Sequence, residues 1–102
     1  MPGVYTVTQM NSYIKNMFRQ DFVLSRISVK GEVSNCKYHT SGHIYFSLKD
    51  GQGVMSAIMF AGSAKNLEFR LENGMQVIVS GRIDVYERDG KYQLYANAIE
   101  PD

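Results

Sequence analysis

The sequence has no tryptophan and a single cysteine among its 102 residues. Cys36 has no partner for a disulfide within the chain, and with only two histidines beside it a zinc site of the usual kind cannot be assembled. We therefore expect no disulfide, no bound metal and no other cofactor. A reducing, cytoplasmic compartment fits this composition. Cys36 itself is expected to be a buried or half-buried residue without a reactive role.

Long apolar runs are also missing. No stretch approaches the ~20 apolar residues that a membrane span needs, so we expect no membrane partner. The opening residues Met1–Tyr5 lack a basic stretch followed by an apolar one, and they predict no secretory signal.

The patterns that accompany catalysis are absent as well. His39 and His43 are the only histidines, and neither a Gly-x-Ser-x-Gly elbow nor a glycine-rich phosphate loop with its lysine occurs. The acidic residues are scattered, and the neighbours Asp84 and Glu87 fall beside a strand end, where solvated roles are expected. We assign no catalytic residue and expect these 102 residues alone not to be an enzyme.

Net charge is only +1, but the charges are unevenly placed. Between Phe22 and Lys49 four basic residues stand against one acid, whereas the segment from Asn66 to Asp102 is acidic overall. The first half could attract phosphate, but its field is weak, so tight binding would need more than charge.

The first quarter of the chain predicts a helix and then a strand. Thr8 is a suitable N-cap, and apolar residues follow it at helical spacing to about residue 20. We expect this helix to pack its apolar stripe on the rest of the chain or on a neighbouring domain. Residues 22–34 then alternate as a strand with Gly31 at a bend, and residues 35–42 form a polar loop.

The remaining elements follow in the order strand, strand, helix, strand, strand. Residues 43–49 and 54–60 form a hairpin across the turn Asp50–Gly53, and residues 63–72 are helical in character. Residues 75–86, bent at Gly81, and 91–99 form a second hairpin. This order predicts a mainly β, five-stranded OB-fold Greek-key barrel with an N-terminal helix (1–21) ahead of it and a short helix between strands 3 and 4. An SH3-like barrel, the main alternative, lacks that intervening helix.

An OB barrel that binds single-stranded nucleic acid presents aromatic platforms and basic groups across strands 2 and 3 and the loops beside them. Tyr45 and Phe60 are expected to point outward there. The candidate nucleic-acid-binding residues are Lys30, Lys37, Tyr38, His39, Tyr45, Lys49, Phe60, Arg82, Arg88 and Lys91. Each has a structural alternative, such as covering the sheet or facing solvent, and Tyr86 and Tyr95 are interpreted as structural.

Several segments are distinctive in combination. Val29–Asn35 reads VKGEVSN, Ser41–Asp50 reads SGHIYFSLKD, and Gly81–Tyr86 reads GRIDVY. With Tyr5–Asn11, Ile58–Phe60 and Gly90–Leu94, they make nearly the whole chain resemble the N-terminal domain of the bacterial exodeoxyribonuclease VII large subunit family. The resemblance implies an OB-fold domain ahead of a longer region that holds the nuclease centre and binds many small subunits. It also implies degradation of single-stranded DNA in the cytoplasm without a divalent metal.

Two hypotheses follow for residues 22–102, the predicted OB domain. In the first, it binds single-stranded DNA and presents it to a nuclease region outside this chain. In the second, it is a structural or assembly module whose outer face packs on protein within the nuclease complex. The basic residues around Tyr45 and Phe60 favour the first. The N-terminal helix or an exposed strand edge offers a surface for a homodimer.

Overall fold

A computed structural model describes residues 3–102, so the predictions that depend on Met1 and Pro2, including the missing secretory signal, lie outside the described residues. Two helices come first, α1 (Val7–Gln20) and the single turn α2 (Phe22–Ser25), and three strands follow, β1 (Ile27–Tyr38), β2 (Ile44–Lys49) and β3 (Val54–Met59). The one-turn helix α3 (Ala61–Ala64) precedes the long strands β4 (Gln76–Tyr86) and β5 (Lys91–Pro101).

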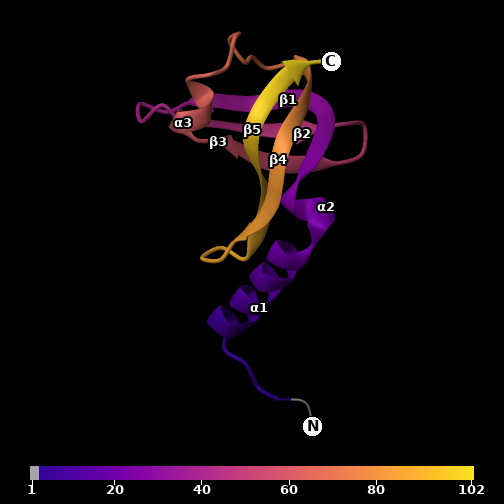
Figure 1. Cartoon of the computed structure of the whole chain (residues 1–102), viewed down its shortest axis with the longest axis vertical. Coiled ribbons are helices and arrows are strands. Elements are labelled where there is room, and N and C mark those ends of the chain that lie inside the picture. Colours follow the sequence, from indigo (N-terminus) through magenta and orange to yellow (C-terminus); the bar gives the residue numbers. More distant parts are fainter. Residues whose placement is uncertain (1–2) are drawn as a thin grey trace.

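The five strands close into a barrel in the order β1-β2-β3-β5-β4 (Figure 1). The barrel closes because β1 is long enough to pair with β4 through its first half and with β2 through its second. The change of partner occurs around Gly31, where an added Cβ would lie 2.8 Å from the carbonyl oxygen of Lys49. The predicted five-stranded OB barrel is confirmed, and both glycines expected at bends lie where a neighbouring strand leaves no room for a side chain.

The core lies inside the barrel and consists of the apolar residues that alternate along the strands. Val33, Phe46, Leu48, Met59, Val77, Val79 and Leu94 are all nearly or completely buried. Ile27, Val29 and Met55 are partly buried and pack against this core from its margin. This alternation leaves the opposite face of β2 free for polar and aromatic residues.

The start and end of the first predicted strand are wrong. Phe22–Ser25 form α2 instead, because Asp21 caps that turn by accepting from the backbone N–H of Leu24. At the other end, residues 35–38 are strand and not loop. A bulge between Ser34 and Lys37, with Asn35 at a φ of 50°, lets β1 continue to Tyr38.

The helix predicted over residues 63–72 is also shorter than expected. Only Ala61–Ala64 is helical, and the chain then runs in an irregular path to β4. Leu71, which is 1% exposed, is drawn into the core, and its carbonyl accepts a hydrogen bond from the Tyr38 hydroxyl at 2.9 Å. These tertiary contacts outweigh the helical spacing of Leu67 and Leu71.

Helix α1 projects away from the barrel beside the β4–β5 hairpin (Figure 1), giving the molecule a longest extent of 53 Å. Its N-cap is Thr6, in a capping box with Gln9, and not the predicted Thr8. Phe18 packs against the core, but the rest of the apolar stripe stays largely exposed, at 39% for Met10, 38% for Ile14 and 57% for Met17. No helix within residues 3–102 is long and apolar enough to cross a membrane.

Candidate nucleic-acid interface

A row of rings crosses the outer face of the barrel. The ring centroids of His39 and Tyr45 lie 6.2 Å apart, and those of Tyr45 and His43 lie 6.5 Å apart. The row continues from His43 to Phe60 at 5.2 Å and from Phe60 to Tyr95 at 5.9 Å. Tyr45 and Phe60 are 43% and 44% exposed, so their rings are available to a ligand.

Strand register explains why these residues meet. Tyr45 on β2 is paired with Ile58 on β3, and Ile58 is paired with Tyr95 on β5, so the three side chains share one face. Arg82 on β4 is the partner of Tyr95, and its guanidinium carbon lies 4.6 Å from the Tyr95 ring centroid. A cation therefore ends the row of rings.

Two adjoining hollows extend along this face and form what we call the groove. The first is lined by Tyr45, Ile58, Phe60, Tyr86, Asp89, Gln93 and Tyr95. The second is lined by Val54, Met55, Ser56, Tyr86, Asp89, Gly90, Lys91, Tyr92 and Gln93. Tyr86, Asp89 and Gln93 belong to both hollows, so a chain lying along the groove has to pass over them.

The loop between β1 and β2 is ordered by its two histidines. The Nδ1 atom of His39 accepts from the backbone N–H of Ser41 at 3.1 Å. The Nδ1 atom of His43 accepts from the backbone N–H of Ala61 at 2.8 Å, which joins this loop to the start of α3. Because Nδ1 is the acceptor in both rings, the neutral form of each carries its proton on Nε2.

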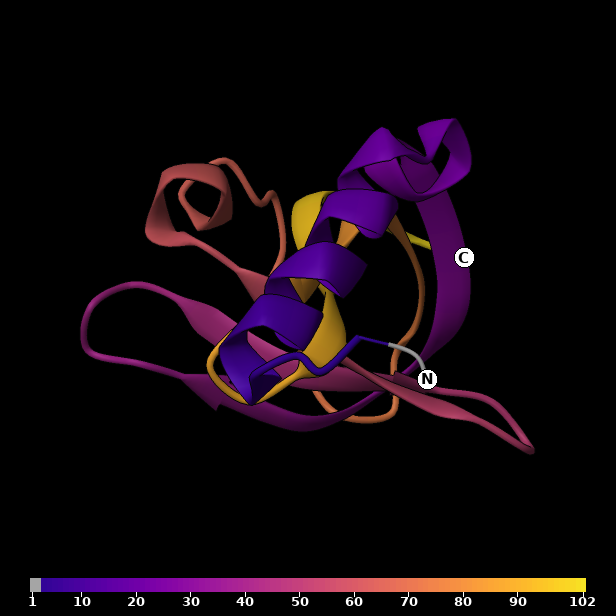
Figure 2. The ribbon, with the colours of Figure 1, turned by 90° about the horizontal axis from the view of Figure 1, so that it is seen from below.

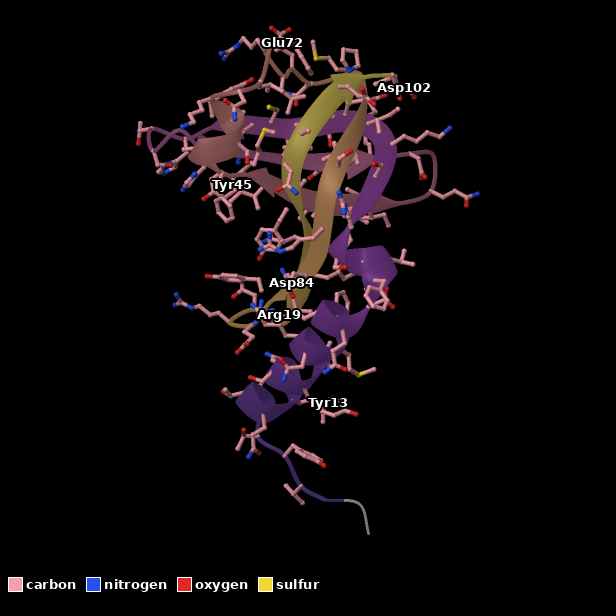
Figure 3. The ribbon with its side chains drawn as sticks, viewed as in Figure 1. Tyr13, Arg19, Tyr45, Glu72, Asp84 and Asp102 are labelled. Carbon is pink, nitrogen blue, oxygen red and sulfur yellow. The ribbon has the colours of Figure 1, made fainter. Side chains whose placement is uncertain are left out.

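The β4–β5 hairpin that borders the groove is held by α1. Asp84 is only 3% exposed, and its carboxylate lies 3.4 Å from the ammonium of Lys15 and 3.5 Å from the guanidinium of Arg19. Lys15 also donates to the carbonyl of Val85 at 2.7 Å, and Asn11 donates to the carbonyl of Glu87. Figure 3 shows Asp84 and Arg19 together where the helix meets the hairpin, and Figure 2 shows α1 crossing that hairpin.

These contacts set the charge state of Asp84. Burial acts to raise the pKa of the carboxyl group, but the hydrogen bond from the Val85 backbone N–H and the charge of Lys15 outweigh it. The pKa of Asp84 therefore lies below its ordinary value, and the residue is an anion that anchors the helix. The solvated role expected for Asp84 is thus wrong, because α1 covers this part of the strand.

The structure brings together five of the ten residues predicted for binding. His39, Tyr45, Phe60 and Arg82 lie along the row of rings, and Lys91 lines the second hollow. Arg88 is exposed at the tip of the same hairpin but lines neither hollow. Lys37 is exposed at the end of β1, and Tyr38 follows it on the strand. Tyr38 is engaged elsewhere: its hydroxyl is bonded to Leu71, and the Arg70 guanidinium lies 4.3 Å from its ring centroid.

Lys30 and Lys49 lie apart from the groove. They line a separate hollow with Glu32, Asp50 and Asp102, and this hollow shares no residue with the groove. The Lys49 ammonium lies 3.6 Å from the Glu32 carboxylate, although Lys49 is on the same strand face as Tyr45. Acidic neighbours thus reduce the attraction of these two lysines for phosphate.

The predicted binding residues do not include His43 of the row of rings, nor the groove residues Tyr86, Asp89, Gln93 and Tyr95. Tyr86 and Tyr95 were interpreted as structural, yet Tyr86 is 43% exposed and Tyr95 belongs to the row of rings. The alternation along residues 91–99 shows that Tyr95 shares a face with Gln93, but only the pairing of β3 with β5 places that face beside Phe60. Within residues 3–102, no cluster of three or more histidine, cysteine or acidic residues is placed to hold a metal ion.

Comparison with known sequences gives a consistent match along the chain. The model of a family described as OB-fold nucleic acid binding domain matches residues 5–100. The exodeoxyribonuclease 7 large subunit of Lachnoclostridium phytofermentans is 67% identical over all 102 residues. That of Ruminiclostridium cellulolyticum is 50% identical over the same length. The chain spans 25% of each of these relatives.

Solved structures with low sequence identity share the fold. A chain from a replication protein A heterotrimer bound to single-stranded DNA superposes with a TM-score of 0.61 at 18% identity, covering 78% of this chain and 58% of that one. Asparaginyl-tRNA synthetase from Pyrococcus horikoshii gives a TM-score of 0.58 at 20% identity, over 74% of this chain and 19% of the synthetase. These likenesses show the barrel architecture.

Proposed function

Because this chain belongs to the family of OB-fold nucleic acid binding domains, we propose that it binds single-stranded DNA along the groove. The observation that carries the proposal is the row of exposed rings from His39 to Tyr95, ended by Arg82 and bordered by the basic residues of the β4–β5 hairpin. The replication protein A structure, which has the same fold, was determined with single-stranded DNA bound.

The groove supplies the two interactions that such binding requires. Rings of Tyr45 and Phe60 offer faces to successive bases, and each stacked base contributes roughly 1–3 kcal/mol. Arg88 and Lys91, both exposed, are available to the phosphates beside the bases. Since the net charge is only +1, stacking has to provide most of the affinity, and binding in the micromolar range or weaker is expected.

The proposed role in a longer protein follows from the relatives. This chain covers a quarter of the length of two exodeoxyribonuclease 7 large subunits that it resembles, and among its described residues no cluster of histidine, cysteine or acidic residues is placed to hold a metal ion. We infer that the domain captures single-stranded DNA and presents it to a nuclease region elsewhere in such a protein. Cytoplasmic DNA degradation and association with several small subunits are part of this proposal.

Titration of a fluorescently labelled oligo-dT by the 102-residue chain tests DNA binding directly. Replacing Tyr45→Ala or Phe60→Ala is expected to weaken binding about fivefold or more, because each removes a stacking platform. Tyr13→Ala is the matched control, since Tyr13 is also an exposed tyrosine, at 61%, but lies on α1 (Figure 3). A folded chain that does not bind oligo-dT at low salt would contradict the proposal.

The same preparation should leave the oligonucleotide intact. The sequence carries no recognised catalytic motif, and no cluster of residues able to hold a metal ion occurs among residues 3–102. Incubation with labelled single-stranded DNA is therefore expected to leave the oligonucleotide at full length on a sequencing gel. Reproducible degradation of the oligonucleotide by a clean preparation would contradict this expectation. If the groove variants degraded it equally well, the chain would carry catalytic groups outside the groove.

An assembly role is the second candidate, and one observation favours it. The apolar stripe of α1 is exposed in this chain, and Phe22 beside it is 92% exposed. Sedimentation of the chain tests whether this stripe makes a homodimer. Concentration-dependent association that Ile14→Glu abolishes, while oligo-dT binding persists, would support assembly through α1 in addition to DNA binding.

A further inference from the structure

The junction of the two hollows carries an unusual set of polar groups for a DNA-binding surface. Asp89 and Gln93 lie there with Tyr86, and all three line both hollows. A DNA strand that follows the proposed groove therefore has to place a nucleotide against a carboxylate. Hydrogen-bonding side chains at this position can distinguish one base from another.

The junction holds one side chain that can only accept hydrogen bonds, the ionised carboxylate of Asp89. Nε2 of Gln93 donates to the Tyr95 hydroxyl oxygen at 2.9 Å, and the Gln93 amide keeps both Oε1 as an acceptor and a second N–H as a donor. The Asp89 carboxylate has no hydrogen-bond or ion-pair partner among the described residues, and only its backbone N–H is used, in a bond to the Tyr86 carbonyl. A carboxylate is purely an acceptor when ionised.

The backbone that carries Asp89 is held by hydrogen bonds. The backbone N–H of Gly90 donates to the Tyr86 carbonyl at 2.9 Å, and Gly90 has a φ of 65°, which closes the hairpin tip over a short turn. Next to the turn, Asn11 and Ser12 of α1 bond the carbonyl and carboxylate of Glu87. Because the hairpin is fixed from two sides, little ordering is needed when a base meets Asp89.

Phosphate is a poor neighbour for this carboxylate, because two anions repel each other at close range. The phosphates are instead attracted to Arg88 and Lys91, the exposed cations on either side of Asp89 in the sequence. With the backbone drawn to those cations, the edge of the base is the part of the nucleotide that is turned toward Asp89 and Gln93.

From this arrangement, and resting on the proposed function, we propose that the groove prefers bases that carry an exocyclic amino group at this junction. Cytosine, adenine and guanine present N–H donors to the Asp89 carboxylate, and cytosine N4 is a recognised donor to Asp and Glu. Uracil and thymine present carbonyl oxygens at the corresponding edge, with a single N–H between them. Asp89 is thus the specificity-determining residue, and the preferred ligands are single strands whose bases carry exocyclic amino groups.

Paired titrations with oligo-dC and oligo-dU of equal length test the proposal, because these pyrimidines are alike in size and differ at the edge presented to Asp89. We expect oligo-dC to bind about threefold to tenfold more tightly, the net effect of one hydrogen bond at a solvent-accessible surface. Asp89→Asn is expected to reduce this ratio toward one, since the new amide N–H donates to uracil O4.

Glu100→Gln is the matched control. Glu100 is an exposed acid on β5 that lines neither hollow of the groove, so its neutralisation removes the same charge and should leave the ratio unchanged. Equal affinity of the unmodified chain for both oligonucleotides would overturn the base preference while leaving DNA binding intact. Failure to bind either oligonucleotide would overturn the proposed function itself. A ratio unchanged in Asp89→Asn would remove Asp89 from the specificity role.

Discussion

At the scale of single residues, Asp84 connects the N-terminal helix to the groove. Its carboxylate is buried against Lys15, whose side chain is only 16% exposed, and Arg19 and Arg82 complete the cluster at longer range. Since Asp84 is two residues from Tyr86, its ion pairs also fix the position at which the hairpin enters the groove. Asp84, which the sequence alone suggests is a solvated surface residue, therefore has a structural role.

Replacing Asp84→Asn is expected to lower the free energy of unfolding by about 1–3 kcal/mol, because it leaves the half-buried ammonium of Lys15 without its counter-charge. Urea denaturation at pH 7 measures this loss. Asp102→Asn, which neutralises an exposed acid at the end of the described chain, serves as the control and should change stability little. Equal stability of both variants would show that the ion pair contributes nothing net.

The same carboxyl group gives a pH dependence whose sign is fixed. The pKa of Asp84 is lowered from its ordinary 3.8 in the folded state, so its stabilisation is complete above that ordinary value and is lost as the pH falls through the folded pKa. The stability difference between the unmodified chain and Asp84→Asn should therefore be constant from pH 7 to about pH 5 and shrink in more acidic solution. A difference that instead grows on acidification would contradict the assignment.

At the scale of elements, the barrel depends on two places where strands come too close for a side chain. At Gly81 an added Cβ would lie only 2.0 Å from the carbonyl oxygen of Tyr95, beside the register shift between Ser80 and Gly81. Gly31 makes the equivalent approach to β2. The close approach at Gly81 places the next residue, Arg82, opposite Tyr95 and over its ring. Gly81 therefore helps to form one end of the row of rings.

Gly81→Ala is expected to destabilise the fold by about 3 kcal/mol or more, because the backbone of β5 has to move to admit the methyl group. Gly62→Ala is the matched control: it lies in α3, nothing is within 4 Å of its added Cβ, and its backbone angle is one that alanine adopts. Thermal unfolding followed by circular dichroism should show a large loss for the first variant and none for the second. A small loss for Gly81→Ala would mean that the strands can separate at little cost.

The elements also show where local patterns are insufficient. The strands 44–49, 54–59 and 76–86 were predicted nearly to the residue because each alternates and is bounded by turn residues. Phe22–Ser25 has β-branched and aromatic character, yet the Asp21 cap makes it a helical turn. Residues 65–72 have helical spacing, yet burial of Leu71 draws them into an irregular path.

At the scale of the whole molecule, charge is segregated although it nearly cancels. Arg82, Arg88 and Lys91 lie along or beside the groove, while Lys30 and Lys49 share a hollow with three acids. The net charge of the whole chain, +1, therefore does not describe the groove, which has cations of its own. Binding should depend on the ions that these few cations displace, and only weakly on the total charge.

The salt dependence of oligo-dT affinity measures the number of ions that are displaced when the DNA binds. With about three cations at phosphates, the logarithm of the association constant should fall with the logarithm of salt concentration with a slope of about −2. Lys91→Ala is expected to reduce the slope by about 0.7, the share of one phosphate contact on a single strand, because Lys91 lines the second hollow of the groove. Lys65→Ala, at an exposed cation after α3 outside the groove lining, should leave it unchanged. An equal effect of both variants would indicate attraction by overall charge.

By itself, the sequence determined the barrel: its alternating strands, bend glycines and turns are local signals, and local signals can be read along one chain. It also identified Tyr45 and Phe60, because outward residues of neighbouring strands follow from alternation. Tyr95, Asp89 and Gln93 became part of the groove only through the tertiary structure. Their neighbours come from strands far apart in the sequence, paired in parallel across the closure of the barrel, and no local pattern encodes that register.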